Sequence, residues 1–195
     1  ENRIDANKIL SIKKEYGNFA LFAGRLVSYK GVDHLIRAMK KVDKDINLVI
    51  IGDGKLKDKL KILVRALGLG KKVFFIDNVD DNLLINFYYS ARVFVLPSVT
   101  SAEAFGIVLL EALACGLPLL STELGTGTSY INEDGVNGFV VEKENPEQLA
   151  EKINILSKSS RLYKNKNRQK AKDLFSLDGM LSKTLNELNE VANKL

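Results

Sequence analysis

The fold is decided by residues 92–121, which read RVFVLPSVTSAEAFGIVLLEALACGLPLLS. Two short apolar runs, Arg92–Leu96 and Leu117–Ser121, flank a longer apolar segment that contains two glutamates. Runs of Val, Leu and Phe without alternating polar residues are typical of strands buried on both faces, as in a parallel sheet. The segment between them, from about Phe105 to Ala114, has the length and composition of a helix. This stretch therefore predicts a strand–helix–strand unit.

The same alternation extends outward in both directions along the chain. Further strands are predicted at Phe19–Gly24, Asn47–Ile51, Val73–Ile76 and Gly138–Val141. Helices are predicted at about Val32–Lys41, Leu56–Leu67 and Asn82–Ser90; Pro146 opens another, and the residues after about Leu149 are expected to form two or three helices. Strands alternating with helices imply right-handed crossovers. We expect an α/β protein with a doubly wound, mostly parallel, six-stranded Rossmann-like sheet and C-terminal helices, in one domain spanning residues 1–195.

The composition is that of a globular protein with a full core, at 46% hydrophobic and 27% charged residues. The net charge of +5 suits an anionic ligand or surface. The basic excess is greatest in Lys158–Lys172, which lacks the interleaved aromatic residues of a single-strand binder. We expect no nucleic-acid partner. Peripheral contact with an anionic membrane stays open beside the simpler interpretation of a solvated face.

The only cysteine, Cys115, excludes an intramolecular disulfide and favours a reducing compartment. A small buried hydrophobic residue is favoured there over a nucleophile. No signal peptide precedes Glu1, and no apolar run reaches the roughly 20 residues of a spanning helix. The expected location is the cytoplasm, with peripheral contact at the inner membrane face left open. Because the sequence does not start with methionine, we expect it to be a fragment that lacks an N-terminal portion.

Glu103 and Glu111 are the candidate ligand-binding carboxylates. Glu111 is the only charged residue between Ala104 and Leu120, and an unpaired buried charge costs several kcal/mol. Eight residues of helix rise about 12 Å, so the two carboxylates cannot share one atom as an acid/base pair. They suit opposite ends of an elongated ligand, since a carboxylate accepts two hydrogen bonds from vicinal hydroxyls. Helix capping by Glu103 and an internal salt bridge to Glu111 are the alternatives.

In a doubly wound sheet, ligands bind beyond the carboxyl ends of the strands. Arg25 and Lys30 follow the first strand and are flanked by glycines, which predicts a phosphate clamp; a solvated loop is the alternative. The Phe105-Gly106-Ile107 turn opens a helix whose free amides favour a phosphate oxygen. A tight turn required by packing explains Gly106 equally well.

Five motifs occur in the order typical of one family. They are Gly24-Arg25-Leu26 through Lys30-Gly31, the segment Val73–Asp80, the segment Glu103–Gly116, Asp134–Phe139 and Phe175-Ser176. Together, from about Ala20 to Phe175, they resemble the group 1 (family four) retaining glycosyltransferases. The resemblance implies the C-terminal, donor-binding half of the two-domain GT-B fold. It also implies that the N-terminal half, which binds the acceptor and carries the active-site histidine, is absent from this chain.

The resemblance further implies a nucleotide-diphosphate sugar as donor, transfer of its sugar to an acceptor hydroxyl, and a role for each candidate residue. Positive charge and the helix dipole would stabilise the departing diphosphate, with no metal and no cofactor. The implied roles are Arg25 and Lys30 for the diphosphate, Glu103 for the sugar hydroxyls, Glu111 for the ribose, backbone from Ile76 to Val79 for the base, and Phe105, Gly106 and Ile107 for phosphate and sugar.

Some features depart from the family pattern. The Thr122–Tyr130 loop lacks the usual glycine pair followed by proline, and His34, the only histidine, is interpreted as a helix-surface residue. We expect the chain alone to bind donor weakly and to transfer nothing. The base, sugar and acceptor are not revealed, so surface carbohydrate, lipid-linked sugars and small glycosides all fit.

Other functions were weighed against this one. A non-catalytic nucleotide-sugar-binding or assembly module has the same fold and stays open. A dinucleotide-dependent oxidoreductase would need a Gly-x-Gly-x-x-Gly turn, which is missing after the first strand. A phosphorylase would need a cofactor lysine environment that is not identifiable. Asp43-Lys44-Asp45 mimics a metal-binding acid pair, but a solvated turn explains it.

Overall fold

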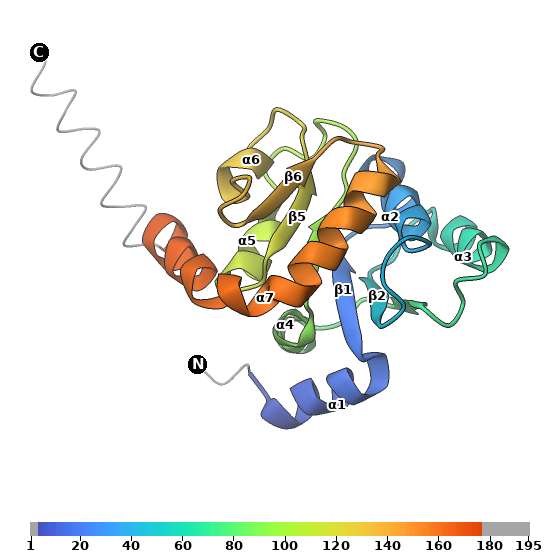
Figure 1. The fold of residues 1–195 in the computed structure, drawn as a ribbon, viewed down its shortest axis with the longest axis horizontal. Coiled ribbons are helices and arrows are strands. Elements are labelled where there is room, and N and C mark those ends of the chain that lie inside the picture. Colours follow the sequence, from blue (N-terminus) through green and yellow to red (C-terminus); the bar gives the residue numbers. More distant parts are fainter. Residues whose placement is uncertain (1–3, 177–195) are drawn as a thin grey trace, which may run out of the picture.

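The computed structural model describes residues 4–176 and is built around a parallel sheet (Figure 1). The strands lie in the order β3-β2-β1-β4-β5-β6, and every neighbouring pair is parallel. Their bounds are β1 Asn18–Ala23, β2 Ile46–Ile51, β3 Val73–Ile76, β4 Val93–Leu96, β5 Leu119–Thr122 and β6 Gly138–Val141. The prediction of a six-stranded, doubly wound α/β sheet is confirmed.

The central strands are buried on both faces, which is why they are continuous apolar runs. All four residues of β4 and all but the first of β1 are buried. Among the strands, the largest difference between predicted and observed bounds is at β5, which begins two residues later than predicted. The amide of Leu117 closes the preceding helix by donating to the carbonyl oxygen of Ala112, and Pro118 has no amide hydrogen to donate to the sheet.

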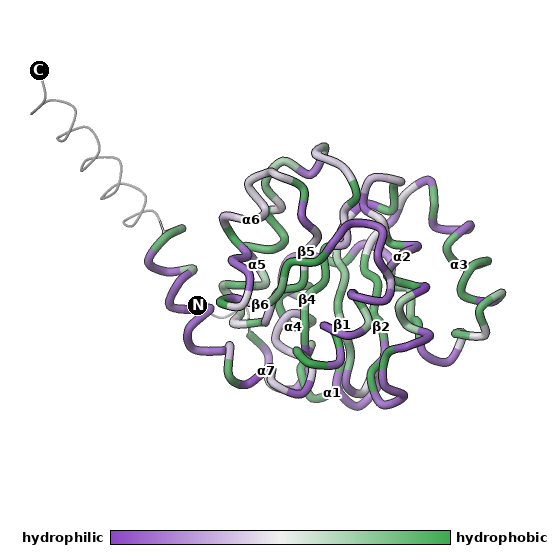
Figure 2. The backbone as a smooth tube through the Cα atoms, turned by 45° about the horizontal axis from the view of Figure 1, so that its top comes forward, coloured by the Kyte–Doolittle hydropathy of each residue, from purple (hydrophilic) through white to green (hydrophobic). Residues whose placement is uncertain are grey.

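Helices cover both faces of the sheet. α2 (Val32–Ala38) packs against α3 (Lys57–Ala66) and α7 (Pro146–Phe175), while α1 (Ala6–Tyr16) packs against α4 (Asp81–Ser90). Figure 2 shows hydrophobic strands at the centre and hydrophilic stretches on the surrounding helices. The remaining elements are the short 3₁₀ helix η1 Ser28–Lys30, α5 Ile107–Ala114 and α6 Thr128–Ile131.

The C-terminal part of the described chain is one long helix. α7 runs without a break for 30 residues, so the prediction of two or three helices is wrong up to Phe175; its remainder lies outside the described residues. The helix is fixed near its middle by Asn167, whose Nδ2 donates to the carbonyl oxygens of Leu117 (2.7 Å) and Asn137 (3.0 Å). α7 is thereby tied to the segments that lead into β5 and β6.

Two helices were not predicted. α1 buries only Ile12, so its hydrophobic periodicity is weak, and its clearest sequence signal is the cap residue Asp5. One oxygen of the Asp5 carboxylate accepts hydrogen bonds from the amides of Asn7 and Lys8. α6 is a single turn inside the segment interpreted as a Thr/Gly-rich loop.

The strand order places the point where the winding reverses between β1 and β4. From β1 the chain moves outward to β2 and β3, then crosses back to β4 and continues outward to β5 and β6. We call the edge formed by the carboxyl ends of the strands the carboxyl rim, and the opposite edge the amino rim. In such sheets the ligand crevice opens on the carboxyl rim where the winding reverses.

Candidate functional site

A buried ion pair lies at this reversal point. The Nζ atom of Lys30, from the loop after β1, is 2.5 Å from Oε2 of Glu103, from the loop after β4. The hydroxyl of Ser98 donates to the same carboxylate oxygen at 2.9 Å. Lys30 and Glu103 are each only 7% exposed, and Ser98 is fully buried. We call these three residues the rim cluster; the sequence predicted Lys30 and Glu103 at this edge but not their direct contact.

The two loops that carry the rim cluster are held together by their backbones. The amide of Val99 donates to the carbonyl oxygen of Tyr29 at 2.8 Å. Gly31 has a positive φ of 61°, and a Cβ there would lie 2.1 Å from the carbonyl oxygen of Pro97. Only glycine permits this approach, which seats Lys30 beside the β4 loop.

Arg25 lies at the same rim but in a different environment. Its side chain is exposed, whereas the Lys30 ammonium lies near Gly24, where a Cβ would be 3.8 Å from Nζ. The loop that contains Arg25 is held by the loop after β2, because the amide of Leu26 donates to the carbonyl oxygen of Asp53 at 2.8 Å. Of the two residues predicted to form a clamp, Lys30 is buried and paired with Glu103, whereas Arg25 is exposed.

The turn before α5 presents the start of a helix to this rim. Gly106 adopts a left-handed conformation with φ of 78°, and no side chain caps the helix among the described residues. Phe105 and Ile107 on either side are exposed, at 38% and 66%. The amide of Leu109 donates to the carbonyl oxygen of Gly106 at 2.8 Å, whereas the amides of Ile107 and Val108 make no hydrogen bond within residues 4–176.

Glu111 differs from expectation. Its side chain is exposed rather than buried, and no cation pairs with it within residues 4–176. Because α5 begins only at Ile107, about 6 Å of helical rise precedes Glu111, and the predicted 12 Å is wrong. The partner of Glu111 is the hydroxyl of Tyr88, which donates to Oε2 at 2.8 Å. Burial, together with the Glu111 charge, raises the pKa of Tyr88.

A cavity of about 440 Å³ opens beside Glu111, between α4 and α5. It is lined by Tyr88 and Leu84 and reaches Asp81 at the first turn of α4. That turn follows the loop after β3, so the cavity begins at the carboxyl rim. Ile76, at the end of β3, and Val79, in the loop that follows, were predicted to meet the base through their backbone; both are half-buried, and neither lines this cavity.

The segment 122–130 lies directly against Glu103. Thr126 donates its hydroxyl hydrogen to the backbone oxygen of Glu103 at 2.9 Å, and the amide of Gly127 donates to the carbonyl oxygen of Ala104 at 2.8 Å. From the sequence, Ser98 was placed at this rim without a role, and Thr126 was not singled out. Their signal was position alone, since both follow strands that end at this rim.

The other residues considered from the sequence lie outside the rim cluster. His34 is on α2, and its Nε2 is 3.7 Å from Oδ2 of Asp33. Burial raises the pKa of Cys115 to about 12, which opposes the thiolate form that a nucleophile needs. Asp43 pairs with Lys158 at 2.7 Å before β2, on the amino rim. Among residues 4–176, no group of three or more acidic, histidine or cysteine side chains is placed to hold a metal ion.

The structure is a Rossmann-like domain with the buried rim cluster at the reversal point of its sheet. The family model described as "Glycosyl transferases group 1" matches residues 4–173. This chain therefore belongs to the group 1 glycosyltransferase family, and the resemblance noted from its motifs is confirmed.

Individual relatives agree with this assignment. The chain is 40% identical over 152 residues to an uncharacterized glycosyltransferase of Methanocaldococcus jannaschii, a match covering 77% of this chain and 38% of the relative. It is 33% identical over 187 residues to the O-antigen chain mannosyltransferase C of Escherichia coli, covering 93% of this chain and 49% of the relative. This chain thus spans half or less of the length of either relative.

A solved structure shares the fold. The Anabaena protein HepE, crystallised in complex with UDP-glucose, superimposes with a TM-score of 0.81 at 23% identity, over 95% of this chain and 53% of HepE. The agreement places this chain in the fold of one half of a GT-B glycosyltransferase. Among the described residues, no helix combines the length and apolar character needed to span a bilayer.

Proposed function

We propose that this chain is the donor-binding half of a retaining glycosyltransferase. It would hold a nucleotide-diphosphate sugar at the carboxyl rim while the sugar passes to an acceptor hydroxyl. The observation that carries the proposal is the buried Lys30–Glu103 pair at the reversal point of the sheet. At this place a carboxylate, held by Ser98, would accept hydrogen bonds from sugar hydroxyls, and an ammonium would pair with a diphosphate.

The diphosphate would lie between Arg25 and Lys30, facing the first turn of α5. Arg25 is exposed and can move toward the anion, whereas Lys30 is already held in place. Cationic side chains together with the uncapped amides after Gly106 stabilise negative charge that grows on the departing diphosphate. These groups supply that stabilisation from the chain's own side chains and backbone.

The two glutamates would serve different parts of the donor. Oε2 of Glu103 accepts hydrogen bonds from Lys30 and Ser98. Its second oxygen, Oε1, makes no hydrogen bond or ion pair within residues 4–176 and would accept from sugar hydroxyls. Glu111 would accept from the ribose at the cavity that begins beside α4, with Tyr88 orienting its carboxylate. The backbone after β3, from Ile76 to Val79, would contact the base.

HepE, whose structure contains UDP-glucose, supports a nucleotide sugar as the ligand class through its shared fold. The acceptor would be bound by an N-terminal half outside this chain; the greater length of the relatives is compatible with this. We further propose a cytoplasmic transferase of carbohydrate biosynthesis, in which Arg25, Lys30 and the start of α5 take the part that a metal or cofactor would otherwise play at the diphosphate.

The test is calorimetric binding of a nucleoside diphosphate and of the bare nucleoside, after an NMR screen of nucleotide sugars has identified the base. Arg25→Ala should weaken the diphosphate roughly tenfold or more and leave the nucleoside unchanged, because one charge-assisted contact is lost. Arg65→Ala, which removes an exposed arginine from α3, is the matched control and should change neither. Equal losses for diphosphate and nucleoside in Arg25→Ala would refute the clamp, and a chain that binds no nucleotide sugar would refute the function.

A further inference from the structure

A second charged site lies on the amino rim, opposite the rim cluster. A cavity of about 420 Å³ opens there, where β1, β4 and β5 begin. Strand β1 has six residues, which span about 20 Å, so the cavity is separated from the carboxyl rim by the length of the strands. The proposed donor therefore does not reach it.

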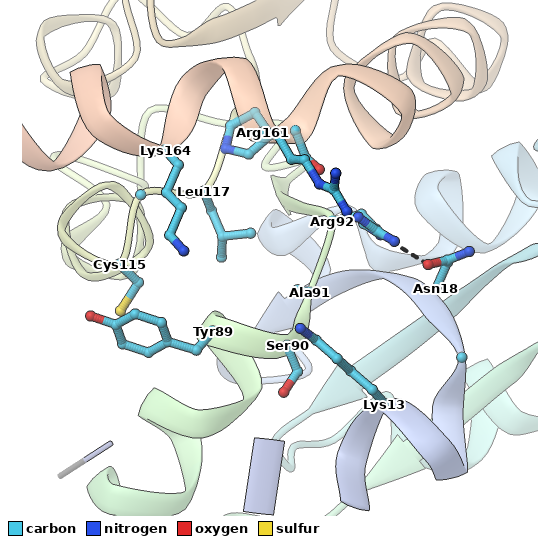
Figure 3. A pocket seen from close by; sticks show the side chains of 14 residues that line it. Lys13, Asn18, Tyr89, Ser90, Ala91, Arg92, Cys115, Leu117, Arg161 and Lys164 are labelled. Atoms are coloured by element: carbon cyan, nitrogen blue, oxygen red, sulfur yellow. Dashed lines mark hydrogen bonds between the residues drawn. The ribbon is translucent and has the colours of Figure 1, made fainter. Parts of the chain in front are cut away.

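Four cationic side chains from three different regions line this cavity, which we call the basic cavity. Lys13 comes from α1, Arg92 from the start of β4, and Arg161 and Lys164 from successive turns of α7. Figure 3 shows Arg161 and Lys164 extending from α7 and Lys13 extending from α1 towards the same space. Convergence from separate elements distinguishes the basic cavity from a solvated helix face.

The charges of the basic cavity are not neutralised by ion pairs in the described part of the chain. None of the described residues that line it is acidic, and within residues 4–176 no carboxylate lies within ion-pairing distance of the four cations. Asp45 lines an adjoining cavity together with Arg92 and Arg161. Burial lowers the pKa of Lys13, and the positive charges of Arg92 and Lys164 lower it further. A bound anion would relieve this repulsion.

One of the cations is held in a fixed orientation. Nε of Arg92 donates to Oδ1 of Asn18 at 2.9 Å (Figure 3), which directs the rest of the guanidinium into the space that Arg161 also lines. A planar guanidinium with free terminal nitrogens is the preferred partner of phosphate, which it binds in a bidentate manner. Lys13 and Lys164 add compact charges around it.

We propose that the basic cavity binds a phosphate group, with Arg92 and Arg161 as the bidentate partners and Lys13 and Lys164 neutralising the remaining charge. The group belongs either to a soluble phosphate ester or to the headgroup of an anionic lipid, since both present the same oxygens. This site is independent of the donor site and of the transfer reaction.

The test is an NMR titration of the full chain that follows the side-chain Nε–H signals of Arg92 and Arg161. Inorganic phosphate at constant ionic strength is the soluble probe, and vesicles of phosphatidylglycerol in phosphatidylcholine are the lipid probe. Because shifts are assigned residue by residue, phosphate bound near Arg25 is counted separately. Saturable shifts of both arginines are expected with at least one probe.

Two double variants of α7 separate a built site from general attraction to a basic helix. Arg161→Gln/Lys164→Gln should weaken the titrated probe roughly tenfold or more. Lys166→Gln/Lys172→Gln removes the same charge from exposed positions on the same helix that do not line the basic cavity, and should change affinity little. Saturation by inorganic phosphate identifies a soluble ligand, and saturation by vesicles alone identifies a lipid headgroup. Equal losses in the two variants, or no shift with either probe, would overturn the proposal.

Discussion

Removing one partner of the buried Lys30–Glu103 pair should destabilise the fold more than removing both. Lys30→Met leaves the Glu103 carboxylate buried with only the Ser98 hydroxyl as its donor. Glu103→Gln leaves the Lys30 ammonium buried against a neutral amide. The double variant leaves no charge in the rim cluster, and its two side chains keep roughly the volume of the originals.

The magnitude follows from burial. Each residue is 7% exposed, so solvent cannot compensate the charge that remains. Breaking a buried pair from one side costs about 3–5 kcal/mol, whereas replacing both partners by neutral side chains is often close to neutral. For a chain of 195 residues, 1 kcal/mol corresponds to about 2–4 °C in Tm. Each single variant should therefore lose roughly 6–20 °C, and the double variant clearly less than the sum.

The assay is urea unfolding of the four proteins of the cycle, checked by thermal melting. The urea dependence of the unfolding free energy should stay constant, since the surface exposed on unfolding does not change. A coupling free energy of about 2 kcal/mol or more is expected. Single variants that each cost less than 1 kcal/mol and add up in the double variant would show that the two charges are not paired in a buried site.

Three further predictions concern individual residues. Glu111→Gln should weaken ribonucleotide binding and spare 2′,3′-dideoxy analogues, with little change in Tm because the side chain is exposed; calorimetry showing equal losses for both ligands would make Glu111 structural. The iodoacetamide labelling rate of Cys115 should keep rising tenfold per pH unit up to about pH 10, because its raised pKa leaves the thiolate a small fraction there; a plateau near pH 8.5 would contradict the burial of the thiol. Gly31→Ala should lower Tm far more than Gly68→Ala, because both have positive φ but only Gly31 faces a backbone oxygen 2.1 Å from the new Cβ; similar Tm losses would refute the close approach.

Much of the fold could be predicted because the strands are buried on both faces. β1 and β4 carry no polar residue in their interiors, so their pattern has one interpretation. α1 was not predicted, because a helix that buries only Ile12 has almost no hydrophobic periodicity in its sequence. The length of α7 could not be predicted, because the helix depends on tertiary contacts such as those of Asn167. Such contacts are not visible in the composition of the sequence.

The candidate site was predictable in its position but not in its pairings. Strand ends placed Lys30 and Glu103 on one rim, yet their contact depends on β1 and β4 being neighbours in the sheet. Glu111 was expected to be buried because its neighbours in sequence are apolar. The helix places it on an exposed stripe with Ile107, four residues earlier, whereas Leu109 and Leu113 face the core.

The backbone bond from Val99 to Tyr29 and the packing of Gly31 on Pro97 join the loops after β1 and β4 into one unit. Neither loop can shift without carrying the other, so the positions of Lys30 and Glu103 are set before any ligand arrives. The conformational entropy that these two loops lose when a ligand binds is correspondingly small. Changes that adapt the site to a different sugar would then occur in the segments around the joined loops, such as the segment that contains Thr126. The joined loops themselves would keep their structure.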